Sequence, residues 1–555
     1  MAFKNLISVT LALSATVLAS SGGYNLSSSR LSPAAQSLFD YSMQVQDSRY
    51  DAYYSFIWYQ DKGPWSTRFT AWYIPGLLYR AQGNDIDNAI SSIEAVLSTQ
   101  MTEDYDSAWY GTYRLSPDAP YPTANGDLYP PKIYTTYDPN WREFVGTALV
   151  QVVEEFSHLL TDDLISRIET SLAENAVGAM RRNGSYPEDD NLVLGYSNPG
   201  LMRALTVGWI GKRLNNQTFI DFARKQGNEL LELFERDGQN VLSEYNAPNY
   251  YGMDMWALAA NVAYGPKDAP MTNNSKHIIT EVWKDVATHF NPYLGNMVGP
   301  YDRAYTRDAT EHSAIISLFW WGVFGRECGP QPPLGEADLL YDVAQGASVS
   351  LIMDTVSQYI DKDTAAALKA KGWWEGSRFI SKTIYEDLET QQYRTASSWV
   401  SAGLMIGGQT VAETVNRGDQ FVPAIVHWAS DPNHAPYPYN GFFSLYPSAS
   451  TITSEVGDGT LRVSYPNTTQ EGTNIFTFAL AGIPPQYFRS PDFKITGLEN
   501  LPCLSVNISA PGLEALQITY GTQLRDHYIY NISYAVPTDF EGIPSVSFEL
   551  EYTCA

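Results

Sequence analysis

One short stretch of the sequence concentrates side chains that could transfer protons. Residues 243–265 read SEYNAPNYYGMDMWALAANVAYG, a polar, tyrosine-rich loop followed by an apolar helix that is predicted to begin near Gly252. Phenols and carboxylates are common general acids and bases in enzymes. Because a structural connector does not need so many of them, we expect these side chains to converge on a functional site.

The candidate residues come from this stretch and from two others, GYSNPGLMRAL and GPYDRAYTRDATEH. The first of the two places an amide at the expected start of a helix, and the second carries arginines and a histidine. The candidates for catalysis are Tyr250, Asn198, Arg303, Glu244 and Asp254. The candidates for substrate binding are Tyr245, Tyr251, Asn249, Arg307 and His312.

Pairs of helices are predicted to position these residues. Apolar residues recur at spacings of three and four, as in WREFVGTALVQVVEEF, which is typical of a helix with a buried face. The first helix of each pair tends to be apolar nearly all round and the second apolar on one side, so we expect the first inside and the second outside. The predicted pairs are 69–79 with 86–97, 141–156 with 164–172, 198–213 with 219–234, 252–264 with 277–290, and 309–324 with 337–356.

Repeated inner and outer helices indicate a mainly α N-terminal (α/α) toroid. The loops at one end of the inner helices would then line a central cleft. A helical solenoid is the competing arrangement, but the sequence has no fixed repeat period of the kind that solenoids show.

A change of period towards the C-terminus indicates a second domain. The segments GTLRVSY, NIFTFALAG, HYIYNISYAV and PSVSFELEY alternate apolar and polar residues, as half-buried strands do. Short strands between Pro, Gly and Asn turns predict a C-terminal antiparallel β-sandwich. The predicted domains are a signal peptide at 1–19, the toroid at 20–370 and the sandwich at 371–555.

The N-terminus predicts a secreted, extracellular protein. Lys4 precedes an apolar run from Leu6 to Leu18 with small residues around Ala19, the pattern of a secretory signal peptide, and the run is too short to anchor the chain in a membrane. Dispersed Asn-x-Ser/Thr sequons fit a glycoprotein. They lie at Asn25, Asn183, Asn216, Asn273, Asn467, Asn507 and Asn531.

The three cysteines are too few for a disulfide scaffold. Cys503 and Cys554 both lie in the β-rich part, and they can pair in an oxidising compartment. Cys328 would then be left over. We expect it to be a buried or inert thiol rather than a nucleophile.

Charge and aromatic content narrow the class of ligand. The formal net charge is −26, which disfavours nucleic acid and anionic membranes as partners. Aromatic residues make up 13% of the chain, enough either for a large core or for a cleft in which rings stack on sugars. An anionic substrate could be accommodated in two ways. Either Arg303, Arg307 and Lys132 form a locally basic cleft, or the substrate itself carries only sparse negative charge.

The segment EYNAPNYYGMDMWAL resembles part of the α/α-toroid polysaccharide lyases of the heparinase II/III-like and alginate-lyase-like kind. In those enzymes a Glu and a Ser/Ala-Pro-x-Tyr sequence lead into an inner helix, and Tyr250 falls at the position of their catalytic tyrosine. The matched motif covers about a dozen residues. The predicted order of toroid and sandwich resembles these lyases over most of the mature chain.

The resemblance implies β-elimination on a uronic acid. An amide or similar group neutralises the sugar carboxylate, a Tyr or His takes the C5 proton, and an acid protonates the leaving oxygen. A phenol, with an ordinary pKa near 10, can act as the base only if a nearby cation stabilises the phenolate. Asn198 resembles the family's neutralising Asn, although Pro199 stands where the family often has His. Arg303 and Arg307 would be the cations, and His312 a possible second base.

Three other functions fit the same sequence. An inverting glycoside hydrolase on a toroid would use two carboxylates about 6.5–9.5 Å apart. An isomerase, dehydratase or cyclase would bind a small molecule in an aromatic cavity, and a non-catalytic glycan-binding protein is the fourth reading. Candidate acids for the hydrolase are Glu244, Asp254, Asp302, Asp308, Glu311 and Glu143, of which Glu244 and Asp254 flank the aromatic stretch.

The sequence predicts no cofactor. It contains no HExxH, no Cys-x-x-Cys and no His pair at helical spacing, and it has no calcium-loop or nucleotide-binding fingerprint. We therefore expect a carbohydrate or small-molecule substrate as the partner, without metal, nucleic acid or membrane.

Overall fold

The computed structural model describes most of the chain from Leu31 onwards, and Leu31–Ala555 forms one compact unit. The described residues are 31–59, 63–123, 129–185, 190–304, 309, 314–330, 343–410, 421–449, 451–467, 474–524 and 527–554. The predicted signal peptide and the sequon at Asn25 lie outside these ranges.

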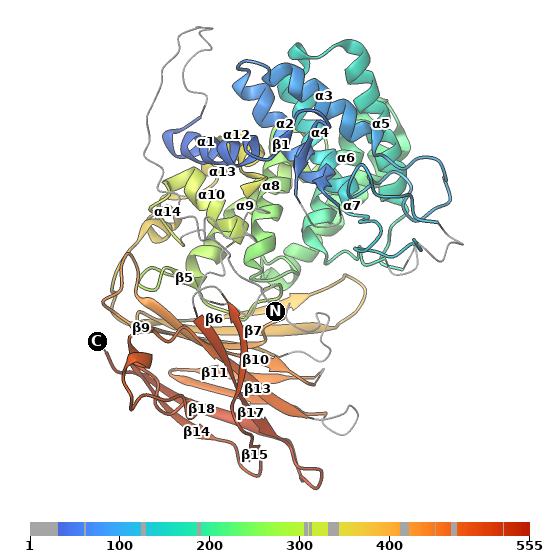
Figure 1. The fold of residues 1–555 in the computed structure, drawn as a ribbon. Helices are drawn as coiled ribbons and strands as arrows, with labels where there is room; N and C mark the ends of the chain where they lie inside the picture. The colour runs from blue at the N-terminus through green and yellow to red at the C-terminus, as the bar shows by residue number, and fades with distance from the viewer. Residues whose placement is uncertain are drawn as a thin grey trace, which may run out of the picture. The chain divides into compact units, whose positions relative to one another are not determined.

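Helices form the first part of the fold and are arranged as two layers of a ring (Figure 1). The inner helices α2, α4, α6, α8, α10 and α12 each pack against the next, and α12 also packs against α2, which closes the ring. The outer helices α3, α5, α7 and α9 each pack on the inner helix that precedes them. The predicted (α/α) toroid is therefore confirmed.

The inner helices are buried on nearly every side because their residues are apolar all round. The long helices are α1 (Pro33–Asp47), α2 (Thr67–Arg80), α3 (Asp85–Ser98), α4 (Trp141–Phe156), α5 (Asp162–Met180), α6 (Ser197–Arg213), α7 (Gln217–Phe234), α8 (Pro248–Tyr264), α9 (Pro270–His289) and α10 (Ala314–Phe324). Shorter helices follow at α12 (Gly346–Leu351), α13 (Met353–Ser357) and α14 (Lys362–Lys369).

Several helix boundaries differ from the prediction. In place of the outer helix predicted at 337–356, the described residues form the two short helices α12 and α13, and α12 belongs to the inner layer. Helix α9 begins at Pro270 rather than 277, and α5 continues to Met180 rather than 172.

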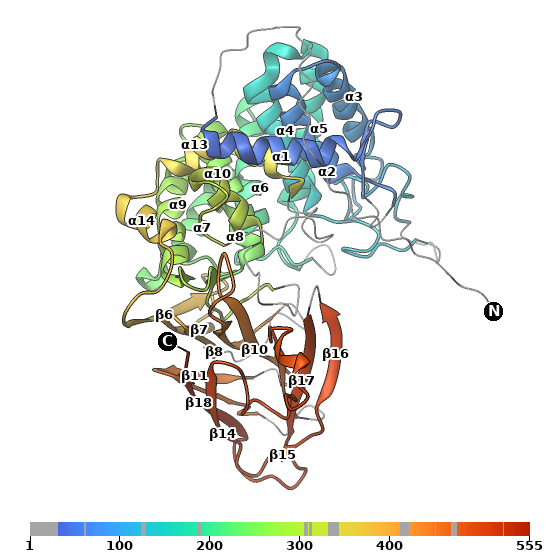
Figure 2. The ribbon, with the colours of Figure 1, turned by 60° about the vertical axis from the view of Figure 1, so that its left-hand side comes forward.

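Helix α8 begins at Pro248 rather than near Gly252, because the fixed φ of proline suits the first helical position. Asn249, Tyr250 and Tyr251 therefore stand in the first turn of a helix and not in a loop. Helix α1, capped by the side chain of Ser32, was not predicted, and it packs on α10 and α12 (Figure 2).

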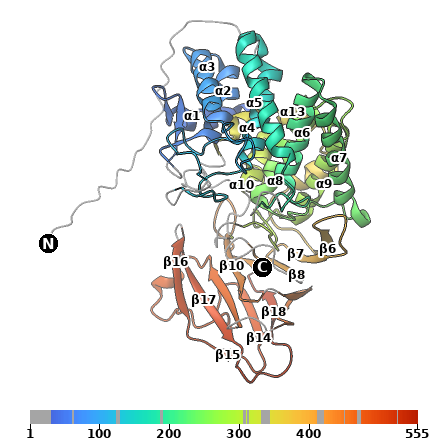
Figure 3. The ribbon, with the colours of Figure 1, turned by 90° about the vertical axis from the view of Figure 1, so that its right-hand side faces the viewer.

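The second part of the fold is a β-sandwich, as predicted. The larger sheet has the strand order β15-β17-β13-β10-β9-β8-β7-β6, with β16 also paired to β17, and the smaller has the order β11-β12-β18-β14 (Figure 3). All pairings are antiparallel. The strands are β6 (Ser377–Tyr385), β7 (Tyr393–Ser401), β8 (Leu404–Thr410), β9 (Ala424–Asp431), β10 (Tyr439–Pro447), β11 (Thr453–Gly457), β12 (Thr460–Ser464), β13 (Ile475–Ala481), β14 (Leu504–Ser509), β15 (Glu514–Ala515), β16 (Thr519–Leu524), β17 (His527–Ala535) and β18 (Ser545–Tyr552).

The two faces of the larger sheet have different partners because neighbouring residues of a strand point to opposite sides. Phe443 faces the smaller sheet, with its ring centroid 5.2 Å from that of Phe548. Phe442, the preceding residue, lies in a separate cluster with Tyr301 and Ala304, which belong to the segment after α9. The sheet thus supports the same segment that carries Arg303.

Short strands connect the main elements. They are β1 (Tyr50–Asp51), β2 (Phe56–Trp58) and β3 (Trp65–Ser66) before α2, and β4 (Phe290–Asn291) and β5 (Asn296–Met297) after α9. Helix α14 ends at Lys369 and β6 begins at Ser377, so the change of architecture falls close to residue 370. The division into separate domains stays a prediction.

Cys503 and Cys554 form a disulfide, and their Cα atoms are 5.0 Å apart. Cys328 is a free thiol of intermediate exposure. Within the described residues, no helix has the length and apolar character needed to cross a membrane.

Candidate active site

The N-terminal ends of four inner helices meet at one end of the ring. The guanidinium of Arg68, in the first turn of α2, lies 5.3 Å from the ring centroid of Trp141, which begins α4. Asn140, just before α4, donates a hydrogen bond from Nδ2 to the Tyr196 hydroxyl, just before α6, over 3.1 Å. Asn198, in the first turn of α6, bonds to Glu244 before α8. The candidate residues therefore share this end.

Glu244 is the centre of the site. One carboxylate oxygen, Oε2, accepts hydrogen bonds from Asn198 Nδ2 at 3.0 Å and from the Ser197 hydroxyl at 3.1 Å. The other oxygen, Oε1, forms an ion pair with Arg303 Nε at 3.3 Å. The sequence did not identify Ser197, although it stands directly before Asn198.

The pKa of Glu244 is raised above its ordinary value. Burial is the main cause, because it disfavours the charged form. Arg303, Ser197 and Asn198 oppose this shift by stabilising the carboxylate. Burial therefore favours the protonated form of Glu244, whereas Arg303, Ser197 and Asn198 favour its carboxylate form.

Arg303 lies between two tyrosine rings. Its guanidinium carbon is 5.5 Å from the ring centroid of Tyr250 and 5.6 Å from that of Tyr196. The two rings meet edge to face with their centroids 6.4 Å apart. Arg303 and Tyr250 are partly exposed, whereas Tyr196 is 7% exposed, so the site reaches solvent through the first two.

Asp254 stands one helical turn beyond Tyr250 on α8 and is fully buried. Its carboxyl oxygens make no hydrogen bond of normal geometry with the described residues. Burial and the neighbouring charge of Glu244 raise the pKa of Asp254 well above its ordinary range, and the nearby Ser197 hydroxyl opposes the shift only in part. Burial and the charge of Glu244 therefore favour the protonated form of Asp254.

Tyr245 and Tyr251, predicted to bind substrate, are buried behind the site. The Tyr245 hydroxyl bonds to His289 Nε2 at 2.8 Å, and the Tyr251 hydroxyl donates to Asp285 at 3.2 Å. Burial raises the pKa of both phenols well above the ordinary value. In this structure both phenols contact protein groups and not an open surface.

Asn249 is partly exposed, and its Nδ2 donates to the carbonyl of Ala304 at 3.2 Å. This bond ties the first turn of α8 to the segment that carries Arg303. Arg307 and His312, the remaining two predicted binding residues, lie outside the described residues.

The β-sandwich contributes to the position of Arg303. Asp302, its neighbour, accepts a hydrogen bond from the backbone N–H of Tyr245 at 2.9 Å and forms a buried ion pair with Arg394 of β7. Gln409 of β8 donates to the same carboxylate at 3.3 Å. These contacts fix the segment before Arg303 from two directions.

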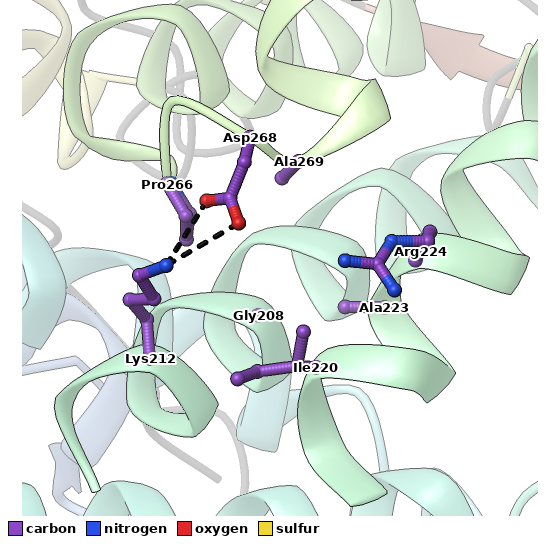
Figure 4. A pocket seen from close by; sticks show the side chains of 8 residues that line it. All are labelled: Gly208, Lys212, Ile220, Ala223, Arg224, Pro266, Asp268 and Ala269. Carbon is purple, nitrogen blue, oxygen red and sulfur yellow. Dashed lines mark hydrogen bonds and ion pairs between the residues drawn. The ribbon is translucent and has the colours of Figure 1, made fainter. Parts of the chain in front are cut away.

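One surface hollow lies far from these residues (Figure 4). It is lined by Gly208, Lys212, Ile220, Ala223, Arg224, Pro266, Asp268 and Ala269. Its polar feature is the exposed ion pair of Lys212 with Asp268, at 3.3 Å. Lys212 is 15 residues along α6 from Ser197, which corresponds to about 22 Å of helix, so this hollow belongs to the opposite end of the ring.

Among the described residues, no group of three or more His, Cys, Asp or Glu side chains is arranged to hold a metal ion. The polar groups at the site are the carboxyls, amides, phenols and the guanidinium described above. Carboxyl and phenol groups can transfer protons.

Residues 36–354 match a family described as "Domain of unknown function (DUF8769)". The chain belongs to this family. Residues 376–551 match a second description, "Domain of unknown function (DUF8770)". The two matches cover the helical and the sheet parts, and neither description carries an activity. No curated protein matches the sequence.

Several solved structures are similar to the chain at low identity. A chondroitin AC lyase from Streptomyces coelicolor A3 has 9% identity and a TM-score of 0.40, covering 95% of this chain and 80% of its own. Heparinase III has 11% identity and a TM-score of 0.42, covering 95% and 86%. Endoglucanase CelQ from Clostridium thermocellum has 8% identity and a TM-score of 0.25, covering 87% and 69%. Similarities at this level do not assign an activity.

Proposed function

We propose that the protein is a secreted polysaccharide lyase that cleaves a uronic-acid-containing glycan by β-elimination. The observation that carries the proposal is the arrangement of Tyr250, Arg303 and Glu244. A partly exposed phenol lies against a guanidinium, and a buried carboxyl holds that guanidinium in place. A tyrosine needs such a cation to act as a base near neutral pH.

The reaction transfers one proton and shifts two bonding electron pairs, of which the C4–oxygen pair leaves with the oxygen. Tyr250, as phenolate, takes the proton from C5 of the uronic acid. The C5–H electrons form the C4–C5 double bond while the C4–oxygen bond breaks. The phenol that results then returns its proton to the leaving oxygen, so the net products are an unsaturated uronate and a free hydroxyl.

Proton removal from C5 requires that the sugar carboxylate be neutralised, because its negative charge opposes a carbanion beside it. Arg303 is suited to this role, since it is partly exposed and can donate a hydrogen bond to an oxyanion, whereas Asn198 is 0% exposed and donates to Glu244. Glu244 holds both of them through its two oxygens, Oε2 for Asn198 and Oε1 for Arg303. We therefore assign Glu244 to positioning them.

The disulfide and the sequons support the extracellular location. Disulfides persist in oxidising compartments and are rare in the cytosol. Every sequon asparagine that the structure describes is at least partly accessible, as N-glycosylation requires. These are Asn183, Asn273, Asn467 and Asn507, which are exposed, and Asn216 and Asn531, which are half-buried.

Glycoside hydrolysis is the second candidate function, and one observation favours it. The pKa of Asp254 is raised well above its ordinary value, whereas Arg303 opposes the rise at the neighbouring Glu244, so the pair could divide the roles of acid and base. In glycosidases, a difference in pKa between two carboxyls determines which acts as the acid and which as the base. Asp254 is 0% exposed, however, and a general acid must reach the glycosidic oxygen, which favours elimination by Tyr250.

Mass analysis of the products separates the two reactions. The purified chain would be incubated with hyaluronan, alginate, polygalacturonate and, as neutral controls, cellulose and starch. Elimination gives a product lighter by one water molecule than the hydrolysis product of the same length. We expect the lighter product from at least one acidic glycan, and hydrolysis products alone would overturn the proposal.

A further inference from the structure

Tyr134 is an exposed aromatic residue close to the candidate active site. It lies in the loop before α4 and is 42% exposed. Its φ angle is 62°, in the left-handed region that residues other than Gly, Asn and Asp rarely adopt. Backbone held in such a conformation is often associated with binding or catalysis.

The hydroxyl of Tyr134 points into the protein. It accepts hydrogen bonds from Asn191 Nδ2 at 2.8 Å and from Asn140 Nδ2 at 3.2 Å. Burial of this end raises the pKa of Tyr134 to about 12. An exposed tyrosine ordinarily turns its hydroxyl to water and its ring to the protein. Here two asparagines hold the hydroxyl, while the residue as a whole stays 42% exposed.

The loop that carries Tyr134 is fixed by its own hydrogen bonds. The backbone N–H of Tyr134 donates to the Tyr137 carbonyl at 2.8 Å, and that of Lys132 donates to the Thr136 hydroxyl at 2.8 Å. The ring is thus set in one orientation before any ligand arrives. A preformed surface loses little conformational entropy on binding.

Asn140 connects this ring to the site. Its Nδ2 also donates to the hydroxyl of Tyr196 at 3.1 Å, and the Tyr196 ring contacts Arg303 and Tyr250. Tyr134 is therefore separated from the proposed base by two side chains. These contacts link Tyr134 to the end of the ring that carries the proposed base.

We propose that Tyr134 forms a second saccharide subsite, in which its ring stacks on the face of a pyranose at least two sugars away from the one being cleaved. Lys132, two residues earlier, is exposed and forms no ion pair with the described residues, so its ammonium is available for a carboxylate or sulfate on that sugar. The inference rests on the proposed action on acidic glycans and adds the position and the charge preference of a second sugar.

Binding affinity for glycans of two lengths tests the subsite. Calorimetric titration would use the full chain carrying Tyr250→Phe, with hexasaccharides and disaccharides of hyaluronan and polygalacturonate as probes and cellohexaose as the neutral probe. Tyr134→Ala is expected to weaken hexasaccharide binding about tenfold, as loss of one aromatic stacking partner would. It is expected to leave disaccharide binding unchanged, because a disaccharide does not need the second subsite.

Three further variants make the result specific. Tyr134→Phe keeps the ring but loses its anchors, and we expect about a threefold weakening. Lys132→Gln is expected to weaken the acidic hexasaccharides alone. Tyr520→Ala removes a tyrosine that is 76% exposed on β16 of the sandwich, and it should change nothing. Thermal unfolding of each variant checks that the fold is intact.

Three results would refute the subsite. Tyr134→Ala and Tyr134→Phe could bind every probe with the affinity of the parent chain, or they could lose equal affinity for hexasaccharides and disaccharides. Absence of binding to every probe would also refute it. Failure of the lyase proposal gives a different result. In that case hexasaccharide binding still depends on Tyr134, while the chain with Tyr250 restored forms no unsaturated product.

Discussion

Each member of the Tyr250, Arg303 and Glu244 cluster is held by the next. Glu244 is buried, and it receives two neutral donors on one oxygen and a guanidinium on the other. Arg303 is therefore fixed in direction, and its flat group contacts both Tyr196 and Tyr250. Because the guanidinium is planar and always charged, lysine cannot reproduce both the stacking and the ion pair.

Substitution of Arg303 tests this arrangement. Arg303→Ala should lower kcat/KM on an acidic glycan by about 100-fold or more, because one preorganised stabiliser of developing charge is lost. Arg303→Lys should fall between this variant and the parent, since it keeps the charge without the planar group. Arg213→Ala is the control, because Arg213 is an exposed partner of Glu169 at the other end of α6. Equal rates for Arg303→Ala and the parent would rule out the proposed role.

The buried carboxyl of Asp254 makes stability depend on pH in a defined direction. Its pKa is raised in the folded state, so between about pH 4 and the folded pKa the folded protein holds a proton that the unfolded chain has released. The contribution of Asp254 to stability is therefore complete below about pH 4 and decreases as the pH rises, by up to about 1.4 kcal/mol per unit.

Asp254→Asn removes this dependence. We expect the two proteins to have the same pH-dependent contribution at pH 4. As the pH is raised to 8, the free energy of unfolding of the variant should increase relative to that of the parent. Urea unfolding of both proteins at several pH values measures the difference. A difference that stays constant across this range would show that Asp254 ionises normally in the folded protein.

At the scale of elements, the helices and strands were predictable because burial imposes a period on the sequence. WREFVGTALVQVVEEF was predicted as a helix over 141–156, and α4 has these bounds. The start of α8 was misplaced because the polar residues after Pro248 read as a loop. Packing of Tyr251 against the core outweighs their weak helix propensity.

The partners of the site residues were less predictable than the elements. Glu244, Asp254 and Tyr250 could be found because they stand close together in one unusual stretch. Arg394 could not, because it comes from β7, which lies 92 residues from Asp302 in the sequence. Tyr134 gave no signal either, since the role proposed for it depends on a backbone angle and on two amides distant in sequence.

The contact between β8 and the segment before Arg303 allows a test of whether the sheet supports the site. Gly407 of β8 lies against the backbone of Gly299 and Pro300, where a Cβ would clash. Gly408, the next residue, faces the smaller sheet instead, with a Cβ placed 2.7 Å from Val456 Cγ2. Only the first glycine therefore adjoins the segment that leads to Arg303.

Alanine at each glycine separates support of the site from general stability. Both variants should lose about 1–3 kcal/mol of stability, as overpacked positions do. Gly407→Ala should also lower kcat/KM at a temperature where both variants are folded, because it displaces the Arg303 segment, and Gly408→Ala should not. Unfolding curves and initial rates provide the two readouts, and equal activities would contradict this link between sheet and site.

For the whole molecule, net charge sets the long-range interaction with substrate. A chain of charge −26 repels a polyanion until salt screens the field. The screening length falls from about 30 Å at 0.01 M salt to about 8 Å at 0.15 M. Local attraction at Arg303 acts over shorter distances and is weakened less.

Turnover of an acidic glycan should therefore respond to salt in an unusual direction. We expect kcat/KM to rise between 0.01 M and 0.15 M salt, because association becomes faster as repulsion is screened. Unfolding measured in the same buffers is the control for changes in stability. A steady fall over this range would mean that local positive charge dominates the encounter.

The most direct measurement for the proposed lyase is the rate at which ultraviolet absorbance of an unsaturated uronate appears. It would be recorded for the parent chain and for Tyr250→Phe on the same acidic glycan, after circular dichroism has shown that both are folded. We predict a steady rise for the parent and a rate lower by about 100-fold or more for the variant, because the base is missing. Equal rates would contradict the role of Tyr250, and new reducing ends without absorbance would contradict elimination itself.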